Sequence, residues 1–189
     1  MTGTAEARDD CQPRKRRAPP RNAAVRRRSA ARLAAVQALY EMDLAGADAD
    51  AVLDGFRAQR WRSETGDDAD SDSATPGAPD PATLEEIFIG AARRCGEIDA
   101  LIAGALNRDW SLDRLEVLLR AVLRAGTYEL LASPAVPPKV VITEYVKVAN
   151  AFFGASETGL VNGVLDQIAR DVRAAEMEAV AVGPEAQAR

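Results

Sequence analysis

The residues best suited to chemistry in this sequence are the arginines near its N-terminus. Residues 1–30 carry nine basic and three acidic side chains, a net charge of +6, so the remaining residues carry −11 of the total of −5. Arg26, Arg27, Arg28 and Arg32 stand at the start of the first predicted helix. Guanidinium groups bind phosphates and stack on unpaired bases, so the pattern favours nucleic-acid binding. A solvated basic tail is the alternative interpretation.

No pattern typical of catalysis or metal binding accompanies these arginines. The sequence has no histidine, the commonest general base and metal ligand. Its two cysteines, Cys11 and Cys95, are too far apart for a zinc motif, and Cys95 is expected to be a buried small hydrophobe. Gly-rich phosphate loops and serine-hydrolase motifs are absent from the sequence. We therefore expect neither an enzyme nor a bound cofactor or metal.

The elements that must position the arginines are helices. Apolar residues recur at helical spacing, and the aromatic share is only 5%, which predicts an all-α fold of about six to seven helices with an aliphatic core. The predicted helices run from Val25 to Gly46, through Val52 and Phe56, from Thr83 to Leu106, from Leu115 to Leu130, from Pro138 to Phe153, and from Leu160 to Val172.

Composition divides the chain into a helical domain and three polar segments. Residues 1–24 are predicted to be a disordered basic arm, and residues 174–189 a disordered tail. Residues 25–173 form one predicted domain, interrupted by a flexible acidic insertion at 63–82. No apolar stretch approaches the ~20 residues of a membrane span, and no signal peptide is evident, so we expect a cytoplasmic protein.

Three local features lead to structural expectations. Gly163 interrupts a periodic helix, which suggests that another backbone packs closely there. Arg124 and Tyr128 are four residues apart and can stack on one helix face. Glu144 and Lys147, three residues apart, are expected to form an ordinary surface ion pair.

Four segments give the sequence a family resemblance. They are Ala34–Tyr40, Leu123–Leu130, Val136–Glu144 and Val161–Asp166, in that order. Together they resemble the NusB family of bacterial transcription antitermination factors, over a stretch from about Val25 to Arg173. The resemblance implies two small helical bundles. It also implies binding, together with the ribosomal small-subunit protein NusE, to the boxA element of single-stranded RNA in ribosomal RNA leaders, with read-through by RNA polymerase.

The resemblance also implies site residues. Those assigned to RNA are Arg26, Arg27, Arg28, Arg32, Ser156, Glu157 and Leu160, of which Leu160 replaces a family aromatic residue. Those assigned to NusE are Tyr40, Asp113 and Leu119.

Two other functions stay open at this stage. One is an accessory module for ribosomal RNA, as in RNA cytosine methyltransferases, although the sequence leaves no room for their cofactor-binding domain. The other is a helical adaptor that binds only proteins. RNA binding by the chain, alone or with NusE, separates the adaptor from the antitermination factor.

Overall fold

The computed structural model describes residues 21–64, 78–107 and 109–181, which form eight α-helices and one 3-10 helix. In chain order they are α1 (Arg21–Ala45), α2 (Ala49–Glu64), α3 (Pro81–Arg93), α4 (Cys95–Ala105), the 3-10 helix η1 (Leu112–Arg114), α5 (Val117–Ala132), α6 (Pro138–Asn150), α7 (Ala155–Val172) and α8 (Ala174–Ala181). The predicted all-α fold is confirmed. None of these helices is long and apolar enough to cross a membrane.

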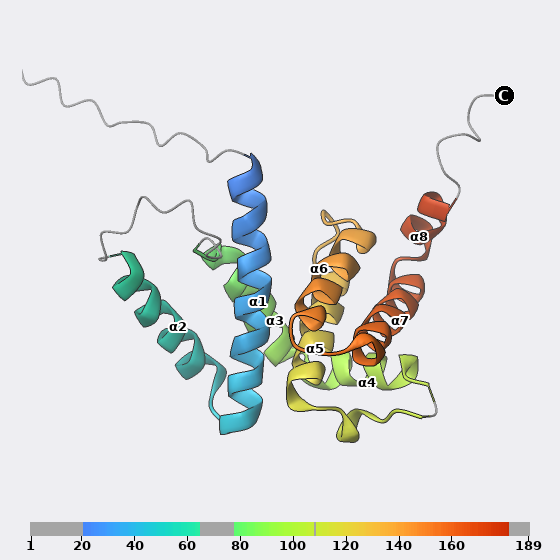
Figure 1. The fold of residues 1–189 in the computed structure, drawn as a ribbon, viewed down its shortest axis with the longest axis horizontal. Coiled ribbons are helices and arrows are strands. Elements are labelled where there is room, and N and C mark those ends of the chain that lie inside the picture. Colours follow the sequence, from blue (N-terminus) through green and yellow to red (C-terminus); the bar gives the residue numbers. More distant parts are fainter. Residues whose placement is uncertain (1–20, 65–77, 108, 182–189) are drawn as a thin grey trace, which may run out of the picture.

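The helices form two groups that meet along α1 and α5 (Figure 1). One group contains α1, α2 and α3, and the other contains α4 to α8. Helix α1 packs against α3 and α5, while α5 also packs against α4, α6 and α7. Helix α5 is therefore the central element, as its broad apolar face in the sequence predicted.

The contact between α1 and its neighbours is built from small side chains. Ala31, Ala34, Ala35 and Ala38 are all buried on α1, which lets α3 and α5 approach its axis closely. On α5 the buried set continues through Leu119, Ala121, Val122, Leu123, Ala125, Gly126 and Leu130. The core is therefore aliphatic, in agreement with the low aromatic content.

Two glycines make close helix contacts possible, and neither is Gly163. A Cβ atom at Gly90 would lie 2.0 Å from the Tyr128 ring, and one at Gly126 would lie 2.9 Å from Leu165. At Gly163, which is exposed, a Cβ atom would have no atom within 4 Å. The predicted packing role of Gly163 is therefore wrong.

The helix predicted from Thr83 to Leu106 is in fact two helices. The chain breaks at Arg94, where φ is −105° and ψ is 20°, and the Arg94 amide still donates to the Gly90 carbonyl. The backbone turns here without glycine or proline, so no sequence signal marked the break. The turn allows α3 to lie on α1 while α4 packs under α5 and α7.

Helices also extend beyond the boundaries expected from the sequence. Helix α1 begins at Arg21, α2 continues to Glu64, and α8 occupies 174–181 with Met177 buried against the core. The remaining parts of the predicted arm, insertion and tail, residues 1–20, 65–77 and 182–189, lie outside the described residues.

A buried arginine ties α1, α4 and α5 together. Arg124 donates to both Asp99 carboxylate oxygens at 2.7 Å and to Asp43 at 2.6 Å. The sequence suggested that Arg124 can stack on Tyr128. In the structure the Arg124 guanidinium forms ion pairs with Asp43 and Asp99, and the Tyr128 ring lies over Gly90. Cys95, beside Asp99, is partly rather than fully buried, and burial raises the pKa of its thiol.

Candidate nucleic-acid interface

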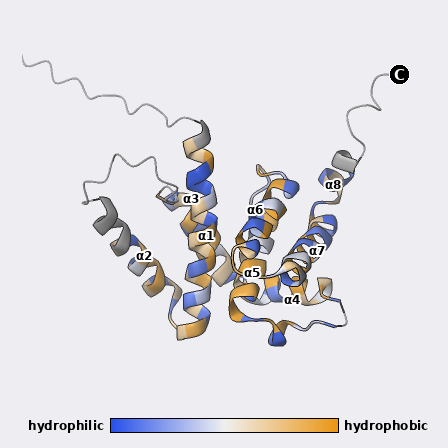
Figure 2. Ribbon diagram, in the orientation of Figure 1, coloured by the Kyte–Doolittle hydropathy of each residue, from blue (hydrophilic) through white to orange (hydrophobic). Residues whose placement is uncertain are grey.

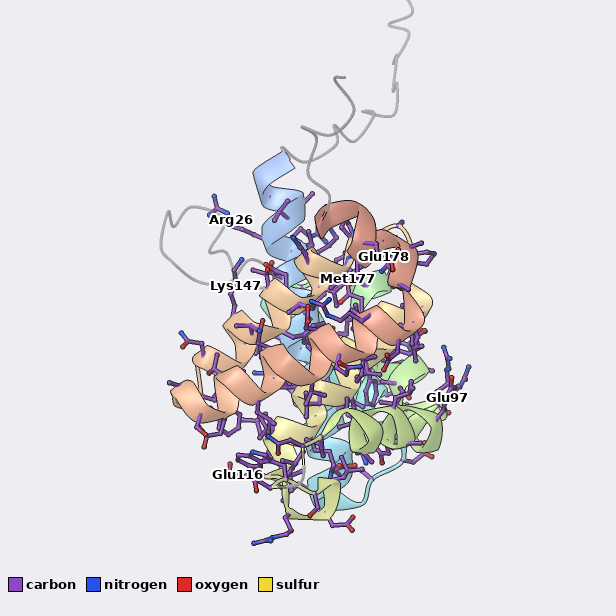
Figure 3. All side chains as sticks on the ribbon, turned by 90° about the vertical axis from the view of Figure 1, so that its right-hand side faces the viewer. Arg26, Glu97, Glu116, Lys147, Met177 and Glu178 are labelled. Carbon is purple, nitrogen blue, oxygen red and sulfur yellow. The ribbon has the colours of Figure 1, made fainter. Side chains whose placement is uncertain are left out.

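The three consecutive arginines of α1 face different directions, because successive residues of a helix are about 100° apart. Arg26 and Arg28 are exposed, and Arg27 is partly buried. The turns that carry them are hydrophilic in Figure 2. Figure 3 places Arg26 on the same edge of the molecule as Lys147 of α6. The exposed cations of α1 therefore lie on two flanks of the helix rather than in one row.

Arg27 and Arg28 border the start of α3. They line a hollow of about 260 Å³ together with Ala24, Asp80 and Thr83. The Asp80 amide donates to the Arg27 carbonyl at 3.0 Å, and the Asp80 side chain caps α3 by accepting from the Thr83 amide at 3.0 Å. Hydrogen bonds from Thr83, with smaller help from the two arginine charges, lower the pKa of Asp80. An acidic cap therefore sits beside this half of the basic cluster.

Arg32 lies inside the protein rather than on its surface. It is 5% exposed and forms a two-pronged hydrogen bond to Glu129, with Nε at 2.9 Å and Nη2 at 2.5 Å. Glu129 also accepts from the Tyr145 hydroxyl at 3.0 Å. Burial alone would lower the pKa of Arg32, but the hydrogen bonds and charge of Glu129 raise it overall. The guanidinium predicted to contact RNA is thus already paired in a buried network.

Glu144 fastens the basic end of α1 to α6. It accepts hydrogen bonds from the Ser29 hydroxyl and from Lys147, the latter at 2.8 Å, and lies 3.6 Å from Arg32. Burial alone would raise the pKa of Glu144, but its hydrogen bonds with Lys147 and Ser29 lower it overall. The predicted pair of Glu144 and Lys147 is confirmed, and it belongs to a larger network than the sequence indicated.

The start of α7 holds the other residues expected to contact RNA. Ser156 is exposed, and Glu157 and Leu160 are half-buried. Ser156 and Leu160 line a hollow of about 360 Å³, the α7 slot, whose other lining residues are Ala105, Asn107, Trp110, Gly159, Gly163 and Val164. Sequence reasoning did not single out Trp110, although a tryptophan in a loop is notable in a chain with so few aromatic residues.

The residues expected to contact a protein partner are not all at the surface. Asp113 is exposed on η1, and Tyr40 is half-buried on α1. Leu119 is 1% exposed and belongs to the core under α5. The structure therefore leaves Tyr40 and Asp113 accessible to a partner. Leu119 is buried, so its substitution would affect the stability of the fold rather than a contact with a partner. The described residues contain no cluster of three or more His, Cys, Asp or Glu side chains suited to a metal ion.

Comparison with known proteins gives consistent matches. A model of the NusB family matches residues 29–170. The transcription antitermination protein NusB of Bradyrhizobium sp. (strain BTAi1) is 48% identical over 151 residues, which cover 80% of this chain and 86% of the relative. The protein of the same name from Agrobacterium fabrum is 45% identical over 157 residues, covering 82% and 92%.

Solved structures resemble the fold over a similar stretch. NusB of T. maritima superposes with a TM-score of 0.61 at 29% identity, covering 80% of this chain and 96% of that one. A crystal structure of antitermination factors NusB and NusE in complex with double-stranded RNA contains a chain with a TM-score of 0.60 at 26% identity. It covers 77% of this chain and 98% of its own.

Proposed function

Because the chain belongs to the NusB family, we propose that it is a transcription antitermination factor that binds boxA-type single-stranded RNA of ribosomal RNA leaders jointly with NusE. In that role it supports read-through by RNA polymerase, in the cytoplasm. The observation that carries the proposal is the family match over residues 29–170, which takes in α1 from Ser29 onward, just after Arg26 and Arg28, and includes the start of α7. The crystal structure of NusB and NusE in complex with double-stranded RNA supports NusE and RNA as partners.

The RNA surface that we propose combines two elements. Arg26 and Arg28 supply exposed cations for phosphates, which give affinity without sequence preference. Ser156, Glu157 and Leu160 supply side chains near the start of α7 that can contact bases. Arg27 contributes less, because it is partly buried next to Asp80.

The buried networks position this surface. Arg32 does not reach RNA in this proposal, since its guanidinium holds Glu129 between α1, α5 and α6. Glu144 holds the preceding turn through Ser29. For NusE, we propose contacts at Tyr40 and Asp113, and we assign Leu119 to the core.

The decisive experiment measures binding of a fluorescent boxA RNA and a scrambled RNA of equal length, with and without purified NusE. We expect the mixture with NusE to prefer boxA, and the full chain to recover NusE from a mixture of ribosomal proteins. Equal affinity for both RNAs, together with no NusE association, would overturn the proposal. NusE binding without any RNA binding would favour the adaptor.

Charge-neutral variants test the arginines within the same assay. For single-stranded RNA, each phosphate contact contributes about −0.7 to the slope of log affinity against log salt. Arg26→Gln and Arg28→Gln should each make the slope shallower by about that amount. Arg57→Gln is the matched control. Arg57 is an exposed arginine of α2, which is a different helix from α1, and it is paired with Asp54 and Glu85.

A further inference from the structure

The exposed face of α6 is cationic. The helix carries two lysines, Lys139 and Lys147, which are both exposed, and its one acid, Glu144, is half-buried. Beyond residue 30 the chain carries a net charge of −11, so a helix face that shows only positive charge to solvent is unlike the chain as a whole. Figure 3 shows Lys147 on the same edge of the molecule as Arg26 of α1.

The ion pair of Lys147 differs from the other surface pairs of the described residues. Its ammonium donates to Glu144 at 2.8 Å, and the lysine side chain is 68% exposed whereas that of Glu144 is 13% exposed. In the other described pairs with an exposed cationic side chain, at Arg57, Arg94 and Arg170, the acid is 37–73% exposed. In those pairs both charges face solvent, but at Lys147 the positive charge faces solvent and the negative charge lies beneath it.

Glu144 faces α1 and holds the lysine in place. Its carboxylate also accepts a hydrogen bond from the Ser29 hydroxyl and lies 3.6 Å from Arg32, so groups of α1 compensate its charge from the inner side. An ammonium group has three donors, so Lys147 can donate to a phosphate while it stays paired with Glu144. Because the pair already restricts the lysine side chain, less rotamer freedom is lost when a phosphate binds.

Helix α6 lies between the two parts of the RNA surface proposed above. It contacts α1 through Ser29 and Glu144, and it packs along α7. Lys147 is in the last turn of α6, which ends at Asn150, and α7 begins at Ala155. A single strand that contacts both the α1 arginines and the start of α7 therefore crosses α6 near this turn.

We propose that Lys147 is a third phosphate contact, which holds the RNA backbone where it crosses from α1 to α7. This inference rests on the RNA binding proposed above and adds a cation on a helix to which that proposal assigns no contact. A lysine acts on a phosphate as a point charge, so this contact adds affinity without sequence preference. Glu144 is the positioning residue for this lysine.

The first test compares charge variants in the fluorescent boxA assay with NusE. Lys147→Gln should make the slope of log affinity against log salt shallower by about 0.7, as expected for one lost phosphate contact. From about 50 to about 200 mM salt, the loss of affinity relative to the wild type should therefore shrink by about 2.6-fold. Lys147→Arg keeps the charge and should keep the wild-type slope.

Two matched controls lose the same charge elsewhere. Lys139→Gln removes an exposed lysine of the same helix, about 12 Å along the axis from Lys147 and at the end away from the start of α7. Arg170→Gln removes an exposed cation of α7 whose partner, Asp166, is also partly exposed. Both controls should keep the wild-type salt slope. All three neutral variants should melt within about 2 °C of the wild type, because exposed ion pairs contribute little to stability.

RNAs that each carry one uncharged methylphosphonate linkage locate the contact. One linkage should weaken wild-type binding and cost Lys147→Gln no further affinity, because the lysine and its phosphate act as a pair. This linkage should differ from the one that behaves in the same way with Arg26→Gln.

The inference fails if Lys147→Gln keeps the wild-type salt slope. It also fails if Lys139→Gln changes the slope equally, because overall charge would then explain the effect. Weaker NusE binding by Lys147→Gln with an unchanged RNA slope would overturn it as well, and would make Lys147 a protein contact. These outcomes leave the proposed function standing. A wild-type chain that binds no RNA, with or without NusE, would instead refute the proposed function, and the Lys147 contact with it.

Discussion

Substituting Arg32 tests whether α1 is anchored by its buried ion pair or presents that arginine to RNA. Arg32→Met keeps a flexible side chain of similar length and removes the guanidinium. It leaves Glu129, which is 2% exposed, with only the Tyr145 hydroxyl as a donor. Removing one partner of a buried pair costs about 3–5 kcal/mol, because the other charge stays buried without compensation. For a chain of this size the melting temperature should fall by roughly 6–20 °C, at 2–4 °C per kcal/mol.

The assay is thermal and urea unfolding followed by circular dichroism, with three variants side by side. Arg32→Met should be strongly destabilised, and adding Glu129→Gln should restore much of the loss, because a neutral amide still accepts from Tyr145. Arg57→Met, at an exposed ion pair, should leave the melting temperature nearly unchanged, because exposed ion pairs contribute little to stability. A single variant that melts within about 2 °C of the wild type would refute the anchoring role, as would a double variant with no recovery. At low temperature, where Arg32→Met is folded, its salt slope for RNA should equal that of the wild type.

Three further outcomes can be checked by unfolding measurements. Asp80→Ala should cost about 1 kcal/mol as a lost N-cap. The pKa of Asp80 is lowered in the folded state, so the stability that its carboxylate contributes is complete above the ordinary pKa of about 3.9. This stability disappears as the pH falls through the folded pKa, so the unfolding free energies of wild type and variant should converge in acid titrations. Gly90→Ala should lower the melting temperature, because its Cβ atom would overlap the Tyr128 ring at 2.0 Å; an unchanged melt would show that the ring moves freely. Replacing residues 65–77 by a short Gly/Ser linker should leave helix content and the melting transition nearly unchanged, since their sequence lacks large apolar anchors.

The sequence predicted the helices well where the spacing of apolar residues agrees with the residues that start and stop a helix. The central helix was predicted from its wide apolar face, and α6 begins at Pro138 as the proline suggested. The break at Arg94 escaped prediction because it uses ordinary residues in an unremarkable backbone conformation. Tertiary packing decides such a turn, since only the folded protein requires α3 and α4 to contact different partners.

The residues whose burial was predicted incorrectly have a different explanation, which is their phase on the helix. Arg32 precedes Val36 by four residues and Leu39 by seven, so it lies on the buried stripe of α1, and its charge had to find an internal partner. Glu129 occupies the matching place on α5. Conversely, Gly163 is out of phase with the buried residues of α7, which are Val161, Val164, Leu165, Ile168 and Ala169. Helical phase could have predicted that Arg32 is buried and that Gly163 is exposed. One sequence alone could not predict that Trp110 lies next to α7, because that contact joins segments far apart in the chain.

The two buried ion-pair clusters also explain how an alanine-rich interface holds a defined register. The alanine face of α1 is smooth, and a shift along α5 by one helical turn would preserve most of its apolar contacts. It would not preserve the charges, because Arg32 near one end of α1 is paired with Glu129, and Asp43 near the other end is paired with Arg124. A shifted helix would leave Arg32, Glu129 and Asp43 without these ion-pair partners and Arg124 with Asp99 alone, a penalty far larger than the loss of a few methyl contacts. The exposed arginines at the start of α1 are therefore set in position, relative to α6 and α7, by charges that are buried or half-buried between the helices.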